Sequence, residues 1–304
     1  MAKRLMLIMT MMCFAATLGF AKSKGTSGAQ FLKIVTAPRA AALGTAYTAF
    51  NDDVNSIAFN PAGLSFLPKK EVALVQNSWI QDISNQYLAA GLPMGTKGTL
   101  GLGVTMLSVK DMVQIPTSGV ATGTKFEASD MAVTLAYAKA FGEKLGVGLS
   151  VKSITQKIEN ESAAGFAADI GVQYRASRKV DLGLAVQNVG TSLKFITEAD
   201  PLPMTIRAGS AYRPLASIAI GLDVIAPNDS DVYAGIGAEY CLKAGQKLVF
   251  PIRAGYRSGY ETEQMSGLGG GLGIVYDNVF SIDYAWNPMG ILGDSMRFGL
   301  SFKF

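Results

Sequence analysis

The sequence contains no histidine among its 304 residues and only two cysteines. Without histidine there is no Ser-His-Asp or Cys-His arrangement and no histidine metal ligand, so hydrolases that depend on an imidazole base are excluded. Cys13 lies in the apolar N-terminal stretch, which leaves Cys241 without a partner for an internal disulfide. A helix cap explains the Asp52-Asp53 pair, and a solvated loop explains Glu261-x-Glu263. We therefore expect no enzymatic activity, no metal and no cofactor.

Charged residues are scarce as well. They make up 16% of the chain, whereas hydrophobic residues make up 49%. This composition argues against disorder and against an ordinary soluble surface. The 27 lysines and arginines and the 23 acidic residues are nearly balanced, so we do not expect nucleic acid as a partner.

Long apolar runs occur only at the N-terminus. A basic start, an apolar stretch and the small residues Gly19 and Ala21 predict a cleaved secretory signal over residues 1–21. After it, the longest uncharged run (residues 54–68) contains Asn, Ser and Pro and is too short for a spanning helix, which needs about 20 apolar residues. An exported apolar chain of this kind favours a transmembrane β-barrel of the bacterial outer membrane over a soluble all-β periplasmic protein.

Residues 70–304 repeat segments of about ten residues with alternating apolar and polar or small side chains. In the last segment Phe298, Leu300, Phe302 and Phe304 share one face. Such alternation allows a strand to face lipid on one side and water on the other. We predict an antiparallel barrel of about fourteen strands, beginning near Lys70, Asn85, Gly98, Ser129, Glu143, Ala164, Arg178, Pro203, Ala216, Ser230, Gln246, Ser266, Asn278 and Asp294.

The predicted connections alternate in length. Those after even strands are tight, and those after odd strands are longer, over residues 109–128, 157–163, 189–202 and 258–265. Short periplasmic turns and long outer loops are typical of outer-membrane barrels. Six aromatic residues also fall at the predicted periplasmic ends of outward-facing strand positions, where rings favour the membrane interface: Phe141, Tyr174, Tyr212, Tyr240, Tyr276 and Phe304.

Inward-facing strand positions carry charges of both signs, among them Arg207, Asp223, Glu239, Arg253 and Asp283. They suit a wet lumen or a polar contact with a plug. The glycines of residues 267–273 (GLGGGLG), in a strand pattern, leave room for such a plug or permit sharp curvature.

Residues 22–69 do not follow the strand pattern and are predicted to form a partly helical hatch inside the barrel. Apolar spacing predicts a helix over residues 40–50. Asn51 and Asp52 are expected to cap a second short helix that runs through Phe59. Pro61 restrains Asn60 to an extended conformation, and Gly63 permits a tight turn.

Several motifs carry a resemblance to a known family. They are residues 31–34 (FLKI), 39–50 (RAAALGTAYTAF), 51–53 (NDD), Asn60-Pro61-Ala62-Gly63-Leu64, 187–190 (QNVG), 200–203 (DPLP), 237–240 (GAEY), 253–257 (RAGYR), 281–284 (SIDY) and 292–294 (LGD). In this order they resemble PorV/PorQ outer-membrane proteins, which are relatives of the FadL fatty-acid channels. The resemblance implies a fourteen-stranded FadL-like barrel with an N-terminal hatch, and a role in type IX secretion.

Three functions are compared. The first is a component of type IX-like protein secretion or surface assembly, with secreted cargo proteins or other secretion components as partners. The alternative is a FadL-like channel for uptake or efflux of hydrophobic small molecules, which predicts a ligand-sized apolar pocket beside the hatch. The third is a structural barrel closed by ionic contacts of Asp52 and Asp53 with Arg207 or Arg253. Outer-membrane lipid surrounds the barrel in each case.

Overall fold

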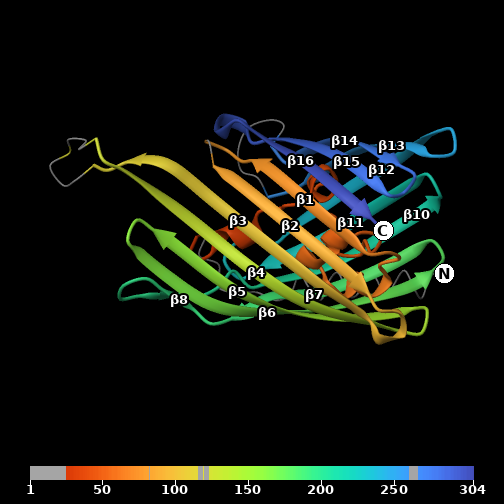
Figure 1. Ribbon diagram of the computed structural model, residues 1–304, viewed down its shortest axis with the longest axis horizontal. Helices are drawn as coiled ribbons and strands as arrows, with labels where there is room; N and C mark the ends of the chain where they lie inside the picture. The colour runs from red at the N-terminus through yellow and green to blue at the C-terminus, as the bar shows by residue number, and fades with distance from the viewer. Residues whose placement is uncertain (1–24, 82, 116–118, 120–122, 260–265) are drawn as a thin grey trace.

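Each wall strand of the computed structural model pairs with its neighbour, and β1 (Glu71–Ser78) closes the barrel by pairing with β16 (Asp294–Lys303) (Figure 1). The structure describes residues 25–81, 83–115, 119, 123–259 and 266–304. The other wall strands are β2 (Ser84–Pro93), β3 (Thr99–Val113), β4 (Lys125–Phe141), β5 (Leu145–Ile158), β6 (Glu161–Ser177), β7 (Val180–Gly190), β10 (Thr205–Leu215), β11 (Ile218–Pro227), β12 (Tyr233–Ala244), β13 (Leu248–Arg257), β14 (Leu268–Tyr276) and β15 (Phe280–Pro288). The short strands β8 (Leu193–Lys194) and β9 (Ala199–Asp200) form a separate sheet between β7 and β10.

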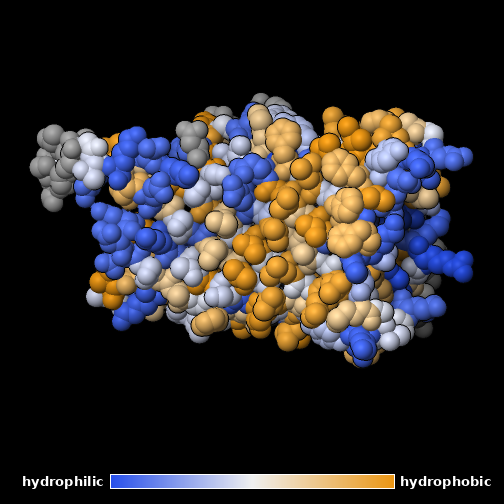
Figure 2. Space-filling model, in the orientation of Figure 1, coloured by the Kyte–Doolittle hydropathy of each residue, from blue (hydrophilic) through white to orange (hydrophobic). Residues whose placement is uncertain are grey.

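The predicted antiparallel barrel of fourteen strands is confirmed, and every wall strand begins within four residues of its predicted start. Alternating burial runs along the strands, as in β12 and β14. Apolar side chains gather in a band across the wall, and hydrophilic ones gather toward both ends of the molecule (Figure 2). The six predicted interface aromatics are all exposed, from 43% for Tyr174 to 61% for Phe304.

The two rims of the barrel differ. One, the turn rim, has the short connections and both ends of the wall, Glu71 and Lys303. The other, the loop rim, has the long connection that contains β8 and β9. One predicted long loop, over residues 157–163, is wrong, because β5 and β6 extend into it and leave a two-residue turn in which Glu159 takes a φ of 54°. At residues 109–128, β3 and β4 extend to Val113 and Lys125, which shortens the predicted loop.

We keep the name hatch for residues 25–69, which run inside the barrel (Figure 1). Their elements are η1 (Gln30–Lys33), α2 (Pro38–Ala42), η2 (Val54–Ala58) and η3 (Pro61–Phe66), while η4 (Gly95–Lys97) and η5 (Gly290–Leu292) lie between wall strands. Within the described ranges, no helix is long and apolar enough to cross a membrane. The predicted signal, residues 1–21, and residues 22–24 lie outside the described residues.

The helical predictions for the hatch are partly wrong. The helix expected over residues 40–50 ends at Ala42, because Gly44 and Thr45 take left-handed φ angles of 61° and 70°. The second helix is the 3-10 turn η2, and Asp53 caps it by accepting a hydrogen bond from the Asn55 amide at 3.0 Å. Gly63 lies inside η3 rather than in a turn; its position is dictated by packing, since a Cβ there would lie 2.6 Å from the Ser56 Cβ.

Wall glycines allow the hatch backbone to lie against the strands. A Cβ at Gly255 would lie 2.3 Å from the Leu43 carbonyl carbon, and one at Gly148 would lie 2.3 Å from that of Pro61. Gly269 and Gly271, in the predicted glycine-rich strand, similarly approach residues 41–42. Because backbone packs directly on backbone, the fully buried large side chains are concentrated in the hatch, with Tyr47, Phe50, Leu43, Ile57 and Leu64 at its centre.

Candidate functional site

Arg39 joins the hatch to the wall. Its guanidinium donates to the two carboxylate oxygens of Glu239 on β12 at 2.9 and 2.7 Å, and to Asp52 at 2.9 Å and Asp53 at 3.0 Å. Burial alone would lower the pKa of Arg39, but the carboxylates of Asp52 and Glu239 outweigh this effect and raise the pKa. Arg39 therefore stays charged and holds three carboxylates together.

The network continues along the wall. Arg253 on β13 donates to Glu239 at 2.6 Å and to Asp283 on β15 at 2.5 Å. Of the predicted site residues, Asp52, Asp53, Glu239, Arg253 and Asp283 thus share one network. In the described structure the aspartates of the hatch pair with Arg39, rather than with Arg207 or Arg253 as proposed from the sequence.

A second fastening involves Asp223 on β11 and Arg207 on β10. One oxygen of Asp223 accepts hydrogen bonds from the amides of Tyr47 and Thr48 at 3.1 and 3.0 Å and from the Thr48 hydroxyl at 2.5 Å. Arg207 donates to that oxygen at 3.1 Å and to the Thr45 carbonyl at 2.8 Å. Buried charges need such partners, so the hatch backbone is fixed at this point.

Asn60 begins the predicted Asn-Pro-Ala-Gly motif and provides a third fastening. It is fully buried and extended, with a φ of −155°. Its side-chain nitrogen donates to the Thr48 carbonyl at 3.0 Å and to the Val172 carbonyl of β6 at 3.1 Å, while its side-chain oxygen accepts from the backbone amide of Ala62 at 3.1 Å. The motif therefore tethers the hatch to the wall by hydrogen bonds rather than presenting a reactive group.

At the loop rim, Asp229 ties down the start of the hatch. This residue is 2% exposed, and its carboxylate accepts from the side-chain amide of Gln30 at 2.6 Å and from the Lys33 ammonium at 2.9 Å. Burial alone would raise the pKa of Asp229, but the hydrogen bonds from Lys33 and Gln30 outweigh it and lower the pKa. The carboxylate is thus charged in the neutral range.

The side of the hatch that faces β1 to β4 is different. Apolar side chains of Val54, Ile57, Leu64 and Leu67 pack there against the wall, in a contact that we call the seam. Its wall residues are small or apolar: Ala73, Val75, Tyr87, Ala89, Ala136 and Ala138, with Gly91, Gly101 and Gly103 between them. At the turn-rim end of the seam, Glu71 accepts a hydrogen bond from the Val54 amide at 3.0 Å.

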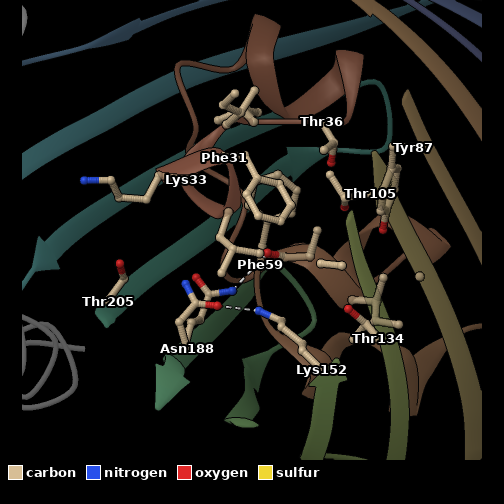
Figure 3. A pocket seen from close by; sticks show the side chains of 18 of the residues that line it. Phe31, Lys33, Thr36, Phe59, Tyr87, Thr105, Thr134, Lys152, Asn188 and Thr205 are labelled. Carbon is tan, nitrogen blue, oxygen red and sulfur yellow. Dashed lines mark hydrogen bonds between the residues drawn. The ribbon is translucent and has the colours of Figure 1, made fainter. Parts of the chain in front are cut away.

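Two cavities adjoin the seam. The outer cavity, of about 60 Å³, lies toward the loop rim and is lined by Phe31, Phe59 and Tyr87, with the hydrogen-bonded pair Lys152 and Asn188 across from Tyr87 (Figure 3). Ile57 of the seam also borders it. The inner cavity, of about 640 Å³, lies toward the turn rim and touches both the seam, at Ala73 and Val75, and the Arg39 network. Neither lining is wholly apolar or wholly charged.

Sequence reasoning missed three residues that organise this region: Arg39, Thr48 and Tyr87. Arg39 left a signal, because a lone arginine in the run of alanines must find carboxylate partners if that run is buried. Thr48 and Tyr87 left none, since their roles depend on strands distant in sequence. In the described part of the chain, no cluster of three or more histidine, cysteine, aspartate or glutamate side chains could hold a metal ion.

Comparison with known proteins gave one family and several structures. The model of the uncharacterised protein family UPF0164 matches residues 8–228. No curated protein matches the sequence. Similar solved structures include the CymD monoaromatic hydrocarbon channel (13% identity, TM-score 0.59, covering 88% of this chain and 97% of that one). The Ralstonia pickettii toluene transporter TbuX has 15% identity and a TM-score of 0.59, with 88% and 98% covered. A Pseudomonas aeruginosa FadL homologue has 10% identity and a TM-score of 0.57, with 88% and 98% covered.

At these identities the structures show a shared fold, the FadL-type barrel. They are channels and transporters rather than enzymes. The PorV/PorQ assignment and the link to type IX secretion find no support in these matches, which agree better with the alternative reading of the sequence.

Proposed function

This chain belongs to the uncharacterised protein family UPF0164, and we propose that it is a non-enzymatic barrel of the bacterial outer membrane that conducts small hydrophobic molecules along the seam beside its hatch. The observation that carries the proposal is the asymmetry of the hatch. It is fastened by buried charges and hydrogen bonds to β6, β10, β11 and β12, and packs through apolar side chains on β1 to β4.

The anchored side and the seam differ in the free energy needed to separate them from the wall. Removing one partner from a buried ion pair costs about 3–5 kcal/mol, because the remaining charge stays without compensation. Apolar contacts between the seam and the wall can instead be replaced by contacts with a hydrophobic molecule, which keeps the surface away from water. A passing apolar molecule therefore separates the seam more readily than the anchored side.

The small wall residues of the seam favour the same route. Ala73, Ala89 and the glycines leave the wall without bulky side chains where Ile57 and Leu64 pack. The outer cavity adjoins the seam at Ile57 and Tyr87, and the inner cavity adjoins it at Ala73 and Val75, so a small sideways shift of the apolar side chains connects them. Rotamer changes of this kind are fast compared with displacement of the entire hatch.

The similar structures and the surface support the location and the substrate class. Two of the neighbours are described as a monoaromatic hydrocarbon channel and a toluene transporter. The band of exposed apolar side chains around the wall suits a lipid environment, with outer-membrane lipid as its partner. Protein secretion ranks below conduction, because the PorV/PorQ resemblance that favoured it finds no support in the matches.

The test is the initial rate of [14C]toluene uptake by cells of a Gram-negative host that lacks its own FadL-type channels. Expression should raise the rate above that of cells carrying the empty vector. Gly103→Phe should abolish the increase, because a Cβ there lies 3.8 Å from Ile57 and the ring would fill the outer end of the seam. Gly270→Phe is the matched control, since a Cβ at Gly270 meets nothing within 4 Å. Equal uptake with and without the protein would refute the proposal.

A further inference from the structure

The outer cavity contains two buried hydroxyl groups without a partner. Tyr87 and Thr36 are each 4% exposed, and neither hydroxyl has a hydrogen-bond partner in the described structure. Both side chains line this cavity, together with Thr105, the residue directly opposite Tyr87 on β3. Figure 3 shows the three side chains at one side of the cavity, facing the ring of Phe31.

A purely structural role does not account for these hydroxyls. Leaving a buried hydroxyl without a hydrogen bond destabilises the folded state, and phenylalanine and valine would fill the same space without this loss. The opposite side of the cavity differs, because Lys152 donates to the Asn188 side chain at 2.6 Å and to no group of the cavity's hydroxyl side. The two buried hydroxyls without a partner, those of Tyr87 and Thr36, thus lie on the side of the cavity away from this pair (Figure 3).

We propose that this corner binds the hydroxyl end of small apolar alcohols and phenols, with Tyr87 and Thr36 as hydrogen-bonding residues. The inference rests on the proposed conduit and narrows its substrates to molecules with one polar group. A water needs about 10–15 Å³, and a cavity of about 150 Å³ holds benzene, so the 60 Å³ found here suits a hydroxymethyl-sized group. The apolar remainder of the ligand then lies toward Ile57 and the seam.

Tyr87 is suited to this role by its position. It belongs to the seam, and its side chain is also one of those that line the outer cavity (Figure 3). A ligand held by that hydroxyl therefore rests at the entrance of the route. Tyrosine and threonine hydroxyls both donate and accept, so they serve an alcohol in either orientation.

The experiment measures dissociation constants of 4-fluorobenzyl alcohol and 4-fluorotoluene by 19F NMR, with the full-length barrel in one detergent. Tyr87→Phe should weaken binding of the alcohol about fivefold, the loss expected for one hydrogen bond, and leave 4-fluorotoluene unchanged. Thr36→Val should act in the same direction. Neither variant removes a hydrogen bond within the described structure, so both should fold. Tyr256→Phe, at a lipid-facing position that is 47% exposed, is the matched control and should change neither constant.

Unchanged alcohol affinity in both Tyr87→Phe and Thr36→Val would overturn the inference and leave the hydroxyls as sites for water only. The conduit itself would still stand in that case, provided that 4-fluorotoluene binds and [14C]toluene is taken up. A wild-type barrel that binds neither probe and takes up no toluene would overturn both proposals.

Discussion

Replacing Arg39 with leucine should release the hatch without unfolding the wall. The Arg39 side chain is 13% exposed and contacts Glu239, Asp52 and Asp53, of which Glu239 and Asp53 are 6% and 10% exposed. Because these two carboxylates would stay buried and lose their shared cation, attachment of the hatch should weaken by about 3–5 kcal/mol. With about 1.4 kcal/mol for each factor of ten, the open population should rise by roughly two to three and a half orders of magnitude.

Hydrogen exchange followed by mass spectrometry measures this change directly. Peptides from residues 38–66 should exchange faster in Arg39→Leu, whereas peptides from the wall strands should keep their wild-type rates, since their hydrogen bonds lie within the sheet. Lys247→Leu is a matched control. It removes a cation from an exposed pair with Asp277, for which less than about 1 kcal/mol is expected. Wild-type exchange of the hatch in Arg39→Leu would refute the view that Arg39 anchors it.

Two further predictions concern packing and pH. Gly255→Ala should lower the free energy of unfolding by about 1–3 kcal/mol, because its methyl group meets the hatch backbone at 2.3 Å, while Gly270→Ala should change it little; denaturant titration measures both. The Asp229 carboxylate has a lowered pKa in the folded state, so its contribution is present above the unfolded pKa of about 3.9 and is lost as the pH falls through the folded value. Limited proteolysis around Lys33 and Gln30 should therefore increase only below about pH 4. Asp229→Asn should remove that step, and cleavage that changes between pH 5 and 8 would contradict this assignment.

The wall was predictable because its signal is local. Lipid on one side and water on the other impose alternation on each strand, and the turns interrupt it at intervals that can be read directly. The strand that contains Phe298 and Phe302 shows this pattern most clearly. Prediction failed at residues 157–163, where the polar residues read as a loop belong to strands that extend beyond the apolar band.

The path of the hatch was less predictable, because strands distant in sequence determine it. The apolar spacing of residues 40–50 is compatible with a helix, yet the backbone leaves the helix after Ala42 and follows wall glycines such as Gly237 and Gly255. Inward charges could likewise be assigned to the lumen by parity, but their pairing could not. Asp223 accepts from the backbone amide of Thr48, Arg207 donates to the Thr48 hydroxyl, and the aspartates of the hatch are held by Arg39.

Function was the least accessible level, since the sequence carries no catalytic or ligand-binding motif. The resemblance to PorV/PorQ proteins led to protein secretion as the first hypothesis, whereas the similar structures favour the FadL-like alternative. Tyr87 illustrates why the function could not be predicted from the sequence. In the sequence it is one aromatic residue in a strand, and its unpaired hydroxyl beside the seam is defined only by the folded barrel.

The most direct test of the central claim staples the hatch to the wall by a disulfide on one side at a time, in a Cys241→Ser background. Val54→Cys with Gly91→Cys closes the seam, since the two Cβ positions lie 3.8 Å apart, as in disulfides. Ala46→Cys with Gly221→Cys staples the anchored side, where the two Cβ positions lie 3.1 Å apart and must separate by a few tenths of an ångström. In the barrel with the seam pair, [14C]toluene uptake should be lost on oxidation and restored by reduction. The barrel with the anchored pair should conduct toluene whether the disulfide is oxidised or reduced. Equal loss in both pairs, or full uptake with the seam closed, would contradict conduction along the seam.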